Sequence, residues 1–179
     1  MLEKIEPTPD LVAYQAMRRF EGHDHLPDAI ALIQTVFFAD ILYLFTTGKE
    51  LIKDRIISNI FTPMHSMFST THACNERIWT EVHFDQPYPK DYIAAALDRP
   101  QRDFIRSIAR VVLDEFDSAS VRGHILKLDC VRNTPYGKMI SKQAIVDGLN
   151  GDDAVSRMAQ HLGLREKETE DNGAPEDSL

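Results

Sequence analysis

Cysteine is scarce in this chain, with only Cys74 and Cys130 among 179 residues. Two cysteines do not form the disulfide framework with which many small secreted domains compensate for a small core. The N-terminus, MLEKIEPTPD, also lacks the basic start and the apolar segment of a secretory signal peptide. These absences favour a protein of the reducing cytoplasm.

Positive charge is also in short supply. The chain has 20 Lys and Arg against 28 Asp and Glu, which gives a net charge of -8. A protein that binds nucleic acid by neutralising phosphates needs clustered Lys and Arg, and no basic stripe stands out in this sequence. We therefore expect no nucleic-acid partner.

The sequence contains none of the motifs that hold phosphates or activate a nucleophile. It has no GxxxxGK[ST] loop and no GxGxxG loop, so no phosphate-binding site is indicated. It also has no GxSxG elbow around a serine. We predict that the protein is not an enzyme, has no catalytic residues and needs no cofactor.

Two clusters could bind a metal, but each set of ligands is incomplete. The first is His23-Asp24-His25, because an HD dipeptide is typical of metal-dependent phosphohydrolases built on helices. Those enzymes also need a ligand His upstream, and no His precedes His23. The second is His72-x-Cys74, which offers two ligands where a structural zinc needs four. We expect no bound metal, and a small helical metal-dependent hydrolase is the alternative function.

Length and composition suit a single folded domain. The chain has a mass of 20.4 kDa, with 43% hydrophobic and 27% charged residues, so it can bury a sizeable core. The last fifteen residues, 165–179, hold six acids and two bases without apolar periodicity. The sequence therefore predicts a folded domain over residues 1–164 and a disordered acidic tail over 165–179.

The most hydrophobic stretch runs from Asp28 to Gly48 and is apolar on nearly every side. Such a helix is either a membrane span or the buried axis of a globular protein. A span needs about 20 apolar residues, and a charge within it is costly. Because this stretch carries Asp40 and Gln34, we predict a buried central helix and no membrane partner. Gly48 suits the left-handed residue that ends a helix.

Asp40 itself needs partners, because it is flanked by Phe37 and Phe38. A carboxylate in an apolar setting must be hydrogen-bonded or suffer a large desolvation cost. We predict that Asp40 is buried and bonded to the segment after Gly48, with Arg55 and the amides near Asp54 as candidates. The alternative is a carboxylate that reaches the surface at the helix edge.

Local signals predict the other elements. Thr8 before Pro9 is typical of a helix start, and Asp98 with Gln101 resembles a capping box. An amphipathic helix should follow over 99–116. The remaining expected elements are an extended segment over 55–61, a helix from Thr62-Pro63 to about 72, strands over 78–84 and 92–97, and helices over about 118–129, 141–149 and 152–162. Together they predict a mainly α fold: a compact helical domain around a buried central helix, with a small β element in the middle.

From Ile33 onward, the order of these features resembles the Panacea domain, the SocA-like antitoxin domain of bacteria and phages. That family has an apolar helix ending in Y/F-F-A-D, then a glycine, an Ile and an Asp, and an extended piece leading into a GP-led helix. The matching positions here are Phe38, Ala39, Asp40, Gly48, Ile52, Asp54 and Pro63.

The second half of the chain carries the resemblance further. LDRPQRDFIRSIARVVLDEF, VRGHILKLDC, PYGK and ISKQAIVDGL follow the family's order, so the resemblance covers roughly Ala13 to Leu149. Three positions depart from the pattern. Thr62 replaces the glycine before proline, Tyr136 replaces the tryptophan of PWK, and Cys130 stands where the family usually has His.

The resemblance implies a non-enzymatic antitoxin that binds and neutralises a cognate protein toxin. Some relatives are adaptors that deliver the toxin to a protease. The family-motif positions are Asp40, Gly48, Asp54, Pro63, Pro135 and Tyr136. The alternative of the same class is a phage or prophage accessory protein that binds a host target.

Aromatic residues are the candidate anchors for such a partner, because Tyr, Trp and Arg are enriched at the energetic centres of interfaces. Tyr136 is itself a family-motif position, and Trp79 and Tyr88 lie between two of these positions, Pro63 and Pro135, in the sequence. We name these three as candidate partner-binding residues, with packing in the core or in a loop as the alternative for each.

Overall fold

The computed structural model describes residues 5–18, 29–59, 62–66, 88–112, 123 and 126–149, and 66% of the interpretable residues are helical. The helices are α1 (Pro9–Met17), α2 (Ala29–Thr47), α5 (Lys90–Ala96), α6 (Arg99–Arg110), α8 (Asp129–Arg132) and α9 (Lys142–Leu149). The strands are β1 (Ile56–Ile57), β2 (Met64–His65) and β3 (Met139–Ile140). This confirms the predicted mainly α fold with a small β element.

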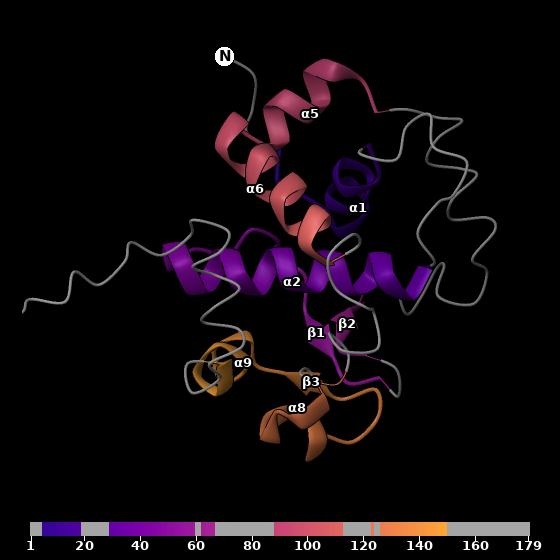
Figure 1. Ribbon diagram of the computed structural model, residues 1–179, viewed down its shortest axis with the longest axis vertical. Helices are drawn as coiled ribbons and strands as arrows, with labels where there is room; N and C mark the ends of the chain where they lie inside the picture. The colour runs from indigo at the N-terminus through magenta and orange to yellow at the C-terminus, as the bar shows by residue number, and fades with distance from the viewer. Residues whose placement is uncertain are drawn as a thin grey trace, which may run out of the picture.

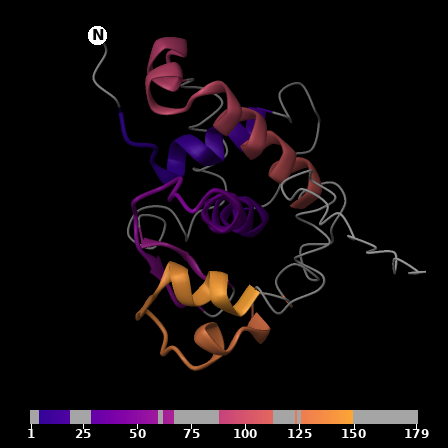
Figure 2. The same ribbon diagram turned by 90° about the vertical axis from the view of Figure 1, so that its left-hand side faces the viewer.

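Helix α2 is the axis of the fold. In two perpendicular views, α1, α5 and α6 lie on one side of it, and the sheet, α8 and α9 lie on the other (Figures 1 and 2). Within the described ranges, its window Ile30–Thr47 alone is long and apolar enough to cross a membrane, and 67% of that window is buried inside the protein. Helix α2 contacts α1, α6, α9 and β2, so it packs as the predicted core helix.

The helix ends follow the local signals in the sequence. Thr8 accepts a hydrogen bond from the Leu11 amide at 3.3 Å, with Pro9 in the first turn of α1. Gly48 ends α2 with φ +67°, the left-handed conformation that costs glycine little. Asp98 and Gln101 form the complete capping box of α6. These three predictions are confirmed.

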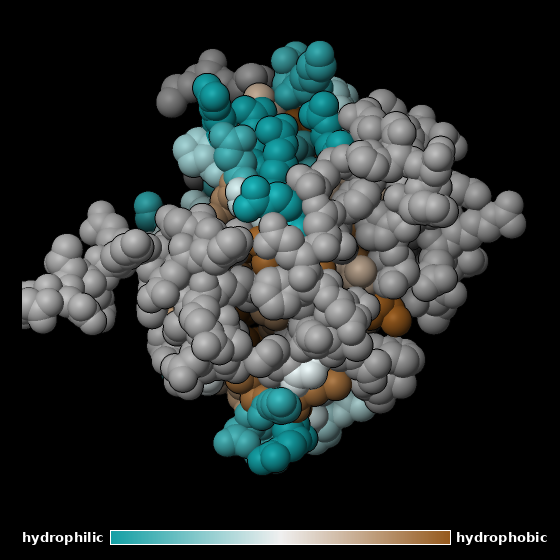
Figure 3. Space-filling view, in the orientation of Figure 1, coloured by the Kyte–Doolittle hydropathy of each residue, from teal (hydrophilic) through white to brown (hydrophobic). Residues whose placement is uncertain are grey.

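Helix α6 contrasts with α2, because only one of its faces is apolar. Ile105, Ile108 and Ala109 are buried, while Arg99 and Arg106 lie on the solvent side. In the space-filling view, hydrophilic residues dominate the described surface over α5 and α6 (Figure 3). The amphipathic period of the sequence therefore predicted the orientation of this helix correctly.

The sheet has the order β2-β1-β3, and both pairings are antiparallel. Ile56 lies opposite His65 in β2 and opposite Ile140 in β3. The predicted helix after Thr62-Pro63 is wrong at its start, because Met64 and His65 form β2. The Thr62 hydroxyl donates to the Pro63 carbonyl at 3.2 Å instead of capping a helix.

Two other expectations need correction. The predicted strand over 92–97 is helix α5, and its sequence KDYIAAA ends in three alanines, the strongest helix formers. The helix expected to end near Asp129 is interrupted one residue earlier, because Leu128 is extended with φ −63° and ψ 130°. Asp129 is instead the first residue of α8.

The helix expected over 141–149 is confirmed as α9, with the Ser141 hydroxyl accepting from the Ala144 amide at 3.4 Å. Three other predictions lie outside the described residues: the strand over 78–84, the helix from 152, and the tail over 165–179 with its boundary at 164.

Candidate functional site

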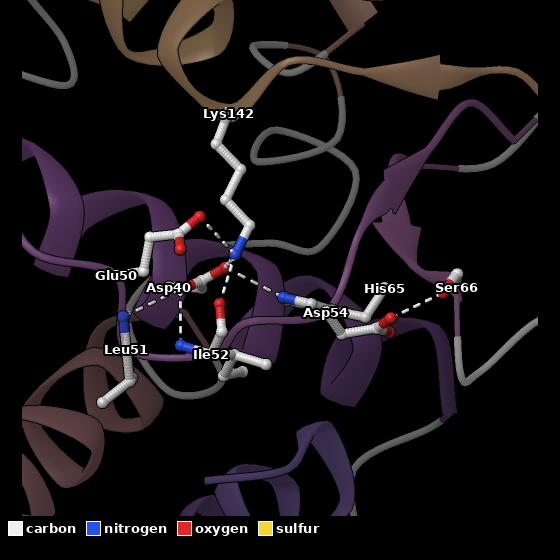
Figure 4. Close-up of polar contacts among 8 residues, drawn as sticks. All are labelled: Asp40, Glu50, Leu51, Ile52, Asp54, His65, Ser66 and Lys142. Carbon is white, nitrogen blue, oxygen red and sulfur yellow. Dashed lines mark hydrogen bonds and ion pairs between the residues drawn. The ribbon is translucent and has the colours of Figure 1, made fainter. Parts of the chain in front are cut away.

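Asp40 lies on α2 at the centre of a buried polar cluster and has no solvent-exposed surface. Its Oδ1 accepts hydrogen bonds from the amides of Leu51 at 3.2 Å and Ile52 at 3.0 Å (Figure 4). The predicted burial, with bonds to the segment after Gly48, is therefore confirmed. The prediction of Arg55 as a partner is wrong, because the amides of Leu51 and Ile52 bind Asp40 instead.

The other carboxylate oxygen of Asp40 is held by two side chains distant in sequence. Its Oδ2 lies 3.0 Å from Nε2 of His65 in β2 and 2.8 Å from Nζ of Lys142 at the start of α9. Because a carboxylate only accepts, Nε2 of His65 carries the shared proton. Lys142 also donates to the Ile52 carbonyl and lies 3.4 Å from Glu50 (Figure 4).

These contacts set the electrostatics of Asp40. Burial raises the pKa of its carboxyl, but the hydrogen bond and charge of His65, followed by the charge of Lys142, outweigh that effect. The net result is a pKa below the usual value of 3.8. Asp40 is therefore ionised at neutral pH despite its burial, as expected for a carboxylate beside opposite charge.

We refer to Asp40, Leu51, Ile52, His65 and Lys142 as the Asp40 centre. It joins four parts of the chain: α2, the segment after Gly48, β2 and α9. Both Asp40 and His65 are fully buried, so neither side chain faces solvent. The geometry is suited to fixing α9 and the sheet onto α2.

The neighbouring family-motif positions support the same junction. Asp54 accepts from the Ser66 hydroxyl at 2.6 Å, which ties the approach to β1 to the end of β2 (Figure 4). Pro63 is buried immediately before β2. With Gly48, which ends α2, these residues shape the chain that supplies the amides bound to Asp40.

Pro135 and Tyr136 lie apart from this junction, in the exposed turn between α8 and β3. Gly137, with φ +73°, allows the chain to reverse there. Tyr136 is 70% exposed and Met139 is 64% exposed, the two large hydrophobic side chains that the described part of the chain presents to solvent. We refer to residues 134–139 as the Tyr136 turn.

Ser58, which follows β1, holds this turn in place. Its amide donates to the Lys138 carbonyl at 2.8 Å, and its carbonyl accepts from the Gly137 amide at 2.9 Å. Its hydroxyl donates to the Thr134 carbonyl at 3.0 Å. Tyr136 is therefore displayed on a turn whose backbone is fixed by the sheet.

The two other candidate anchors differ from Tyr136. Tyr88 is half-buried, with its ring 5.2 Å from that of Tyr14 and 5.6 Å from that of Tyr92. Burial raises the pKa of its hydroxyl. Tyr88 thus packs within an aromatic cluster, whereas Trp79 lies outside the described residues.

The candidate metal ligands named from the sequence lie outside the residues that the structure describes. They are His23, Asp24, His25, His72 and Cys74. In the described ranges, no group of three or more His, Cys, Asp or Glu is placed to hold a metal ion. Half-buried Cys130 is a free thiol whose pKa is raised by burial.

Sequence reasoning missed His65 and Lys142 as members of the Asp40 centre. His65 fell in a segment interpreted as a helix, so its pairing with Ile56 was hidden. Lys142 did leave a signal: it occupies the first turn of α9, where the helix dipole disfavours a cation. In the fold, the carboxylate of Asp40 compensates this charge.

No family model matches the chain, and neither a curated protein nor a solved structure is similar enough to it to be matched.

Proposed function

We propose that this protein is a cytoplasmic antitoxin of the Panacea type, which neutralises a cognate protein toxin by binding it directly. The proposal begins from the ordered series Asp40, Gly48, Asp54, Pro63, Pro135 and Tyr136, which resembles the pattern of that family. The observation that supports it is that these positions fall into two groups, one in the buried interior and one on an exposed turn.

The first four positions of the series lie within or beside the Asp40 centre. Pro135 and Tyr136 instead lie on the exposed Tyr136 turn. A scaffold motif that ends in an exposed aromatic residue is what a binding domain requires, because aromatic anchors contribute much of the energy at interfaces. Tyr136 and Met139 together offer a hydrophobic contact that the fold does not use.

The polar interior supports a binding role in preference to catalysis. Asp40 and His65 form the described pair that most resembles catalytic machinery, and both are fully enclosed. The four hydrogen-bond and ion-pair contacts of Asp40 are all made within the protein. This arrangement leaves the exposed turn as the better candidate for functional contact.

Co-expression with the neighbouring gene tests the proposal. Expressed alone, that gene should arrest growth, and this protein should relieve the arrest and co-purify with its product. Tyr136→Ala should weaken the rescue, and Tyr136→Phe should largely retain it because the ring is kept. Arg99→Ala is the control, because its side chain is 87% exposed on the polar face of α6.

Three outcomes decide between the modes of action. A harmless neighbouring gene would remove the support for an antitoxin. Rescue with a stable complex supports direct neutralisation. Rescue without a complex, together with a toxin that persists when a protease is deleted, would support delivery to that protease instead of neutralisation by binding.

A further inference from the structure

A pocket of about 430 Å³ opens beside the Tyr136 turn, between the end of α2 and the start of α9. Its apolar lining includes Leu44, Ile56, Met139 and Ile140. The pocket therefore reaches from the hydrophobic core to Met139, whose side chain is largely exposed. Its volume falls within the range of about 300–1,000 Å³ that is typical of ligand sites.

Among the described strands, β3 lies at an edge of the sheet, because the order is β2-β1-β3. The Ser58 amide donates to the Lys138 carbonyl, so the carbonyl of Lys138 faces β1 at this position of the register. Pairs alternate along antiparallel strands, so the next pair, Ile57 and Met139, is not hydrogen-bonded. The N–H and C=O of Met139 consequently point away from β1, toward the edge that no described strand covers.

The pocket lining contains the acids Glu50 and Asp54 as well as the cations Lys53, Arg55 and Lys142, and Arg55 is the cation among them that is left for an acidic ligand group. Glu50 pairs with Lys142, Asp54 accepts from Ser66, and Lys53 pairs with Glu6 at 2.7 Å. Arg55 also lines the pocket and is exposed, and among the described residues it has no ion-pair partner. A carboxylate entering the pocket would find this guanidinium available for a two-point contact.

We propose that the β3 edge and this pocket form a docking site for an extended, acidic segment of a partner protein. The segment adds beside β3 as a fourth strand and bonds to the backbone of Met139, as in other cases of strand addition. It places an apolar side chain against Met139 and a carboxylate against Arg55. The identity of this partner as the toxin rests on the proposed function. The docking site itself can be tested with peptides alone.

Random linear seven-residue peptides, displayed on phage and selected on the full chain, provide the probe. The enriched peptides should alternate β-branched or apolar residues with polar ones and carry an Asp or Glu at a fixed position. For a synthetic copy, Arg55→Glu should weaken binding at least about tenfold, the range for losing a charged hydrogen-bond partner. Arg99→Glu makes the same charge change on α6 and should leave affinity within about twofold, as a remote, screened charge would.

The backbone contact has its own test. Methylating the peptide amides one at a time should reduce binding with a period of two, because alternate amides of an added strand face β3. On the protein side, Met139→Pro removes the outward N–H, while Met139→Ala keeps it. The peptide scan leaves the protein unchanged, so it decides the matter even where Met139→Pro fails to fold.

Each outcome bears on one idea. Failure to enrich any peptide, a peptide insensitive to Arg55→Glu, or a methylation scan without alternation would overturn the docking site. Peptides with the expected signatures support the site even where the neighbouring gene product forms no complex, and that absence would count against the proposed function alone. Where a complex forms, competition by the peptide links the two.

Discussion

The Asp40 centre and the Tyr136 turn both depart from the usual rule that charged side chains are exposed and large hydrophobic side chains are buried, and they do so in opposite ways. The first buries two ionisable groups completely, and the second exposes two large hydrophobic groups. The buried groups are compensated by contacts within the protein, whereas Tyr136 and Met139 are left in solvent. The first departure serves the fold, and we propose that the second serves a partner.

Removing the central carboxylate should give the largest effect on stability. Asp40→Ala leaves Lys142 without its main counter-charge, and breaking a buried ion pair costs about 3–5 kcal/mol. We expect the free energy of unfolding, measured with urea, to fall by about that amount. Asp103→Ala on the exposed face of α6 is the control and should change it by less than about 0.5 kcal/mol. An unchanged stability for Asp40→Ala would contradict the role of the centre.

The contact between Asp40 and Lys142 joins parts of the chain that are 102 positions apart, and a double-mutant cycle should detect it. Asp40→Asn and Lys142→Met should each destabilise the protein, and the double variant should lose less than the sum. Coupled neighbours show interaction energies of about 0.5–3 kcal/mol. Simple additivity would mean that α9 is held by other contacts, chiefly the burial of Ile145 and Leu149.

Acid should weaken the centre selectively. Because the pKa of Asp40 is lowered in the folded protein, its contribution is fully present above the unfolded value of 3.8. That contribution is lost as pH falls through the lower folded pKa. The stability difference between the wild type and Asp40→Asn should therefore shrink as pH falls below about 4. Urea unfolding at a series of pH values measures this, and a constant difference would show that Asp40 keeps the same protonation state throughout.

The smallest effect on stability is expected at the Tyr136 turn. Tyr136→Ala removes a side chain that is 70% exposed, so the free energy of unfolding should change by less than about 0.5 kcal/mol. Ser58→Ala is the companion variant, because it removes the hydroxyl that donates to the Thr134 carbonyl and leaves the side chain of Tyr136 unchanged. A loss above about 1 kcal/mol for Tyr136→Ala would mean that the ring packs in the fold.

Features coded by neighbouring residues could be predicted from the sequence. The caps at Thr8 and Asp98 depend on residues within one helical turn, and Gly48 marks the end of α2 by its own conformational freedom. The burial of Asp40 followed from its apolar neighbours. Its bonds with the segment after Gly48 could also be predicted, because the two amides that it binds, those of Leu51 and Ile52, follow it by only eleven and twelve residues.

Features that depend on distant pairing could not be predicted. His65 became part of a strand because Ile56 pairs with it, and no local pattern announces that register. Lys142 reaches Asp40 only because β3 brings α9 back onto α2. At 92–97, the expected partner strand is instead part of helix α5, where the helix propensity of three alanines prevails.

One measurement tests the central claim most directly: the affinity of the neighbouring gene product for the wild type and for Tyr136→Ala, by isothermal titration. The account predicts a complex with the wild type and binding at least about tenfold weaker for the variant, in the range expected for an interface anchor. The urea midpoint of the variant should match that of the wild type. Absence of a wild-type complex, or equal affinities for the two proteins, would contradict the claim that this turn is where the protein meets its partner.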